Sequence, residues 1–128
     1  MRTRNDEGLG LIEVLVAMGI FVVAIVGAAT MIVYAMRLQS QSTNLTNTRA
    51  VATRQIEELR VLHIDNAQRT VGGSLTANVA NHFSTATAGF LIRWEIVVGP
   101  AGTKDITVRV IPTNPRFQPV QVQGMLWP

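Results

Sequence analysis

An uninterrupted apolar segment near the N-terminus constrains this chain more than any other feature. No charged residue occurs between Val14 and Met36, and valine, isoleucine, alanine and methionine dominate this stretch. A helix of about 20 apolar residues crosses the hydrocarbon core of a membrane. The segment therefore predicts a transmembrane helix. Arg2 and Arg4 precede it, and this positive charge places the N-terminus in the cytoplasm.

The helical pattern continues beyond the apolar segment. Apolar residues with helical spacing follow at Leu38, Leu45, Ala52, Ile56, Leu59 and Leu62. Proline, which would interrupt a helix, does not occur before Pro100. We predict one helix from about residue 9 to about residue 64. Its first half lies in lipid, and its second half presents an apolar stripe to the rest of the chain.

The C-terminal residues predict a small antiparallel sheet. Apolar and polar residues alternate along 90–98 and again along 104–111, which is the period of a half-buried strand. Glycine and proline at 99–102 are typical of a turn between them. Val120 and Val122 indicate a third strand. We interpret 70–88 as a loop that contains one short strand at most. The predicted fold class is α+β: one long N-terminal helix packed through its second half against this sheet.

Charge predicts how the first two strands pair. Oppositely charged residues favour directly opposite positions on neighbouring strands, so we expect Glu95 to face Arg109. The same register places Ile96 opposite Val108 and Val98 opposite Ile106.

The residues before the apolar segment carry the most specific motif. A short basic leader ends in Gly8, and Leu11, Ile12 and Glu13 follow at the head of the helix. This pattern resembles the N-terminal signature of type IV pilins and of the pseudopilins of type II secretion. The resemblance implies that prepilin peptidase, a membrane-embedded aspartyl protease, cuts between Gly8 and Leu9. It also implies N-methylation of Leu9 and a role for Glu13 in subunit assembly.

Elementary electrostatics gives Glu13 a role beside the resemblance. A carboxylate inside an apolar helix is costly in lipid, so we ask which positive group pairs with it. Cleavage after Gly8 would create a positive amine on Leu9. In a filament this amine could meet Glu13 of the next subunit, and the pair would fix the axial register between subunits. In the alternative interpretation, Glu13 lies at the headgroup level, where the helix dipole favours it.

The resemblance implies three parts and a cellular route. Residues 1–8 are the cleaved leader, 9–36 the transmembrane and filament-core helix, and 37–128 an extracytoplasmic pilin-like domain. The chain starts as a single-pass protein of the bacterial inner membrane, with its N-terminus cytoplasmic before processing. It then reaches a pilus, a pseudopilus or the cell surface. Its partners are prepilin peptidase, other pilins or pseudopilins contacted through the N-terminal helix, and an inner-membrane assembly platform with its ATPase.

Residues 50–60 and the strand around Trp94 are similar to minor pilins of the PilV kind and to pseudopilins of the GspI kind. This likeness favours a minor type IV pilin that serves priming and assembly, adhesion, motility or DNA uptake. The alternative is a pseudopilin of a type II secretion system. Two further readings remain: an ordinary exported protein cut after Ala28, and a signal-anchored protein that never polymerises.

The other polar residues do not suggest catalysis. Cysteine is absent, and His63 and His82 are too few to form a metal site with the residues around them. We therefore expect no enzyme activity, no cofactor and no metal. The net charge is +3, and Arg93, Arg109 and Arg116 are dispersed along the chain. Dispersed arginines are typical of a solvated face, so we expect no direct nucleic-acid binding.

Overall fold

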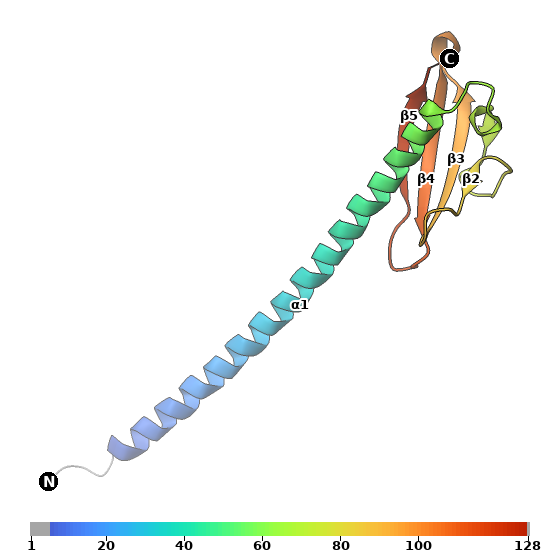
Figure 1. The fold of residues 1–128 in the computed structure, drawn as a ribbon. Coiled ribbons are helices and arrows are strands. Elements are labelled where there is room, and N and C mark those ends of the chain that lie inside the picture. The colour runs from blue at the N-terminus through green and yellow to red at the C-terminus, as the bar shows by residue number, and fades with distance from the viewer. Residues whose placement is uncertain (1–5, 128) are drawn as a thin grey trace. The chain divides into compact units, whose positions relative to one another are not determined.

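The computed structural model describes the backbone of residues 6–127 and the side chains of residues 10–127 (Figure 1). Residues 1–5 of the predicted leader lie outside the described residues. The chain divides into two compact units, Met1–Ser40 and Gln41–Pro128. The elements are α1 (Asp6–Val61), the 3-10 turn η1 (Ala67–Arg69), β1 (Gly72–Gly73), β2 (Phe83–Ser84), β3 (Phe90–Val98), the 3-10 turn η2 (Pro100–Gly102), β4 (Lys104–Pro112) and β5 (Val120–Leu126).

Helix α1 confirms the prediction of one long N-terminal helix. It begins at Asp6 rather than near residue 9, and it ends at Val61 rather than near residue 64. In the first unit, every side chain from Gly10 to Ser40 is exposed. Among the described residues, α1 is the one helix long and apolar enough to cross a membrane. A helix that is apolar on all sides requires an apolar environment, such as lipid or neighbouring helices.

The second unit contains a five-stranded antiparallel sheet in the order β1-β3-β4-β5, with β2 also paired to β3. Strands β3, β4 and β5 confirm the predicted meander. The segment interpreted as a loop contains two short strands instead of one. Both lie along the free edge of β3, where Gly72 pairs with Ile96 and Phe83 pairs with Arg93.

The predicted register between β3 and β4 is wrong by two residues. Arg93, not Glu95, lies opposite Arg109, and Glu95 lies opposite Thr107. The turn sets this register, because the amide of Gly99 donates to the carbonyl of Thr103 at 2.8 Å. This hydrogen bond closes the turn locally. A register shift of two residues preserves the alternation of side chains between the two faces of the sheet, so the same residues still face the helix. Turn geometry therefore outweighs the single charge pair on which the prediction rested.

The core lies between the second half of α1 and one face of the sheet. Helix residues Ala52, Ile56 and Leu59 are buried against Ile92, Trp94, Ile96, Ile106, Val108, Val110 and Leu126. Leu38 and Leu45, the earlier members of the predicted stripe, are exposed. The stripe is therefore covered only from about Thr48 onward. A side chain at position 124 would come within 3.1 Å of Ile56 Cγ2, so Gly124 lets the helix lie close to β5.

A buried arginine joins the end of the helix to the end of the sheet. Arg69 donates from Nη1 to the Leu62 carbonyl at 2.7 Å and from Nη2 to the Trp127 carbonyl at 2.8 Å. Its own carbonyl accepts from Lys104 Nζ at 3.0 Å. Carbonyls at a helix C-terminus have no partner within the helix. Arg69 therefore caps α1 and fixes residues far apart in sequence at one end of the second unit.

We expect Gly73→Ala to lower the free energy of unfolding by about 2 kcal/mol. Gly73 has a φ of +98°, and a Cβ there would collide with the Trp94 carbonyl oxygen and lie 2.9 Å from His82 Cδ2. Gly72→Ala is the matched control, because its φ is +133° but its Cβ would meet nothing within 4 Å. Thermal unfolding of the full chain in detergent measures both losses. Equal destabilisation by the two variants would contradict the collision.

Candidate processing and assembly site

The first turns of α1 carry all three residues predicted to act in processing and assembly. The backbones of Gly8 and Leu9 lie within the helix; the side chain of Leu9 lies outside the described residues. Glu13 follows four residues after Leu9, which is one helical turn and a rise of about 6 Å along the axis. Residues with this spacing share one face of a helix. The predicted cleavage point and Glu13 therefore lie one helical turn apart along α1.

The surroundings of Glu13 leave its carboxylate open to another molecule. Its side chain is exposed, and side chains on a helix lean toward the preceding turn. That turn contains Gly10, where an added Cβ would meet nothing within 4 Å. Ala17, one turn further along, is also small. A neighbouring helix can therefore approach this face closely.

Glu13 has no ion-pair partner within residues 10–127. The ion pairs of this part of the chain are Arg54–Glu58, Arg60–Glu57 and His63–Asp65, all in the second unit. A carboxylate in a membrane-spanning helix is costly unless it is paired or lies at the interface. A positive group from another subunit would reduce this cost.

The two histidines lie apart and make separate contacts. His63 follows the end of α1 and pairs with exposed Asp65, with 3.4 Å between Nδ1 and Oδ2. His82 is buried, and its Nε2 lies 2.9 Å from the Thr70 carbonyl. Nowhere in the described part of the chain do three or more histidine or acidic side chains gather as metal ligands do.

The structure does not bring the three candidate arginines together on one free surface. Arg93 and Arg109 face one another on β3 and β4. Arg93 Nη1 donates to the Thr76 carbonyl at 2.7 Å, and Arg109 Nη1 donates to the Leu75 carbonyl at 3.3 Å. These two carbonyls, which belong to the segment between β1 and β2, thus offset the repulsion between the two guanidinium groups. Arg116 lies elsewhere, in the loop before β5.

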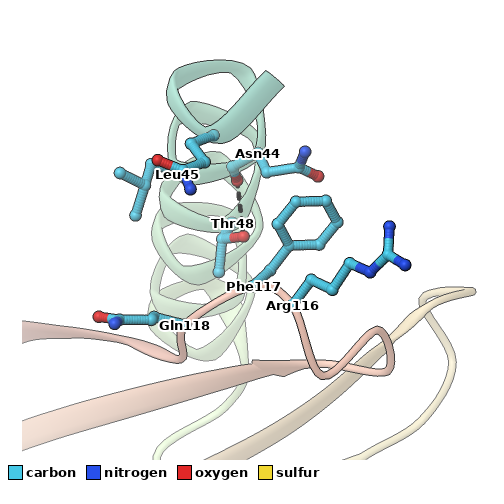
Figure 2. A pocket seen from close by; sticks show the side chains of 7 residues that line it. Asn44, Leu45, Thr48, Arg116, Phe117 and Gln118 are labelled. Atoms are coloured by element: carbon cyan, nitrogen blue, oxygen red, sulfur yellow. Dashed lines mark hydrogen bonds between the residues drawn. The ribbon is translucent and has the colours of Figure 1, made fainter. Parts of the chain in front are cut away.

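A cavity of about 260 Å³ beside Arg116 in the second unit was not predicted from the sequence. The cavity lies between the start of this unit's helix and the loop before β5. It is lined by Gln41, Asn44, Leu45, Thr48, Arg116, Phe117 and Gln118. Figure 2 shows the Phe117 ring beside the helical turn that carries Asn44 and Thr48. Leu45 belongs to the part of the apolar stripe that the sheet leaves uncovered. An apolar residue of the stripe beyond the reach of the predicted strands is the one signal that could have indicated the cavity.

The comparisons with known proteins agree with the N-terminal site. Residues 3–29 match the family model of the prokaryotic N-terminal methylation motif, and this range includes Gly8, Leu9 and Glu13. No curated protein and no solved structure matches the chain. The motif, at the head of an apolar helix, is the one found in prepilin-like precursors. It supports a precursor similar to type IV pilins or pseudopilins, on which prepilin peptidase would act, and the apolar helix fits anchoring in the inner membrane.

Proposed function

We propose that the chain is a minor pilin, a subunit that enters a type IV pilus and serves its priming and assembly. The observation that carries the proposal is Glu13, an exposed carboxylate on an apolar helix without an ion-pair partner within residues 10–127. Such a group suits polymerisation, because each added subunit can supply the missing positive charge. The second unit is compact and lacks cysteine, which favours a minor subunit over a bulk one.

The proposed mechanism begins with leader removal. Prepilin peptidase cuts between Gly8 and Leu9, and the new N-terminus of Leu9 is methylated. Its amine remains positive and lies at the start of its own helix. The amine then pairs with Glu13 of a neighbouring subunit as an assembly platform, driven by its ATPase, draws the subunit out of the membrane. Pairing two charges in a medium of low dielectric offsets the desolvation cost of both.

The role of each part follows from the chemistry of its residues. The uncharged residues 14–36 of α1 can exchange lipid for neighbouring helices without exposing charge to either. The second unit, with its own buried core, stays outside the membrane throughout. No catalytic step, cofactor or metal takes part in this proposal, and direct nucleic-acid binding is not part of it.

The test is the cellular fate of the tagged chain in its native host. Surface filaments are sheared from the cells and purified, and the chain is quantified against the most abundant filament subunit by mass spectrometry. A minor pilin is expected in these filaments at a small fraction of that subunit. A pseudopilin would instead stay in the cell envelope, and deletion of its gene would arrest the export of secreted proteins. That second outcome would replace the proposal with the pseudopilin alternative.

A further inference from the structure

The second unit's helix begins with a stretch of weak helix formers, residues 41–47, which we call the polar segment. Leu45 is its one apolar residue, and the others are glutamine, serine, threonine and asparagine. Serine, threonine and asparagine have low helix propensity, because their side chains compete for backbone hydrogen bonds. Residues 54–60 of the same helix are mostly arginine, glutamine, glutamate and leucine, which favour a helix. Local propensity therefore favours opening of the polar segment before the rest.

Side-chain hydrogen bonds weaken the helix further at this point. Thr46 Oγ1 donates to the Ser42 carbonyl at 3.0 Å, and Thr48 Oγ1 donates to the Asn44 carbonyl at 2.7 Å. A hydroxyl that bonds the carbonyl four residues back competes with the helical backbone for the same acceptor. Such bonds slightly destabilise a helix and often bend it.

The sheet does not cover the polar segment. Its apolar residue, Leu45, is 44% exposed, and full burial along the helix begins only at Thr48. The division between the two compact units falls immediately before the segment. A short helical stretch is marginal in water unless packing supports it. The polar segment therefore depends on whatever contact the loop before β5 provides.

Phe117 provides that contact. Its half-buried ring lies beside the helical turn that carries Asn44 and Thr48 (Figure 2). Asn44 and Phe117 both line two cavities, of about 260 and 370 Å³. A well-packed interior has few voids larger than a water molecule, so the loop packs loosely against the helix here. The contact between this loop and the polar segment thus depends on the Phe117 ring.

We infer that residues 41–47 open and close as a local unit while the core of the second unit stays folded, and that Phe117 holds them closed. The opening is a property of the free chain and does not depend on the proposed function. Only its use within a filament would rest on that function.

Opening changes the connection between two parts of α1. It interrupts the helix between the uncharged residues 14–36 and the helix residues that are buried in the core. A residue of extended chain spans about 3.3 Å, whereas a helical residue rises about 1.5 Å. Unwinding of the polar segment therefore lengthens the connection by roughly 13 Å and removes its stiffness. A minor subunit must fit among subunits of another kind, and an adjustable connection permits that fit.

Amide hydrogen exchange of the purified full-length chain in detergent tests the inference, with peptic fragments read by mass spectrometry. Residues 41–47 are expected to exchange at least about a hundredfold faster than residues 52–60. Exchange in the core requires unfolding of the whole unit, whereas exchange in the polar segment requires only its own opening. Equal protection of the two stretches would overturn the inference.

Phe117→Ala tests the contact that holds the segment closed. It should speed the exchange of residues 41–47 about tenfold further and leave that of residues 52–60 unchanged. Phe83→Ala is the matched control, because Phe83 is also a partly exposed phenylalanine but lies on β2, opposite Arg93. It should leave residues 41–47 unchanged. The inference fails if Phe117→Ala speeds both stretches equally, changes neither, or acts no differently from Phe83→Ala.

Ser42→Ala combined with Thr46→Ala tests the segment in the opposite direction. The two alanines raise helix propensity and remove the Thr46 hydroxyl, so exchange of residues 41–47 should slow roughly fivefold. Thr53→Ala is the control, because Thr53 is an exposed threonine in the covered part of the helix, and it should leave that exchange unchanged. This test does not depend on a destabilised variant, and the absence of any slowing would count against local opening. Failure of the proposed function would remove the chain from filaments without altering any of these exchange rates.

Discussion

Glu13→Ala is expected to leave leader removal intact and to lower the incorporation of the chain into filaments by at least about tenfold. The substitution leaves the scissile bond and the apolar helix unchanged. It removes the carboxylate that would pair with the N-terminal amine of a neighbour. Breaking one partner of a desolvated ion pair costs about 3–5 kcal/mol, because the remaining charge stays unpaired. The ratio of chain in sheared filaments to chain in membranes measures the effect.

Two further variants separate charge from shape at this position. Glu13→Gln keeps the size of the side chain but loses its charge, and it should fail nearly as badly as Glu13→Ala. Glu57→Ala is the control, because Glu57 is an exposed acid of the second unit that pairs with Arg60 on its own helix. Such surface pairs contribute little, so incorporation should stay normal. Normal incorporation of Glu13→Ala would contradict the pairing argument.

Gly8→Val is the second substitution with a large expected effect. A protease must reach the backbone at the bond it cuts, and Gly8 leaves that bond free of a side chain on the leader side. The branched side chain of valine would crowd the bond, and we expect at least a tenfold loss of leader removal. The chain should then accumulate with its first eight residues attached, which intact mass spectrometry of the membrane fraction resolves directly.

Gly10→Ala is the control for this prediction. Both positions are glycines near the start of the helix, but Gly10 lies beyond the scissile bond, and an added Cβ there would meet nothing within 4 Å. Leader removal should therefore be nearly unchanged. If Gly8→Val were processed at the normal rate, or if Gly10→Ala blocked processing equally, the cut would not lie after Gly8.

Local pattern was sufficient to predict most of this fold. The uncharged run after Glu13 and the absence of proline predicted one long helix, and alternation around Trp94 and Val108 predicted the strands that cover it. The register of β3 with β4 was wrong, because the turn after Val98 closes through backbone hydrogen bonds that side-chain charge does not reveal. Strand β1 was missed because Gly72 and Gly73 offer no side-chain pattern to read.

The candidate site was likewise predictable from the sequence only in part. Gly8, Leu9 and Glu13 are close in sequence, so their spacing alone was sufficient to place them together at the start of α1; their roles stay predictions. The cap on the end of α1 could not be predicted, because Arg69 brings Leu62 and Trp127 together across most of the second unit. The pairing of Glu13 with the Leu9 amine of another subunit stays a prediction, because residues 10–127 of one chain contain no ion-pair partner for this carboxylate.

The most direct test of the account is the mature N-terminus of the native protein, measured by intact mass and terminal peptide sequencing. The account predicts a chain that begins at Leu9, with or without a methyl group on its amine. A chain that begins at Ala29 would be an ordinary exported protein, with Glu13 discarded and no role left for it in a filament. A chain that still begins at Met1 would be an unprocessed anchor and would contradict the account as well.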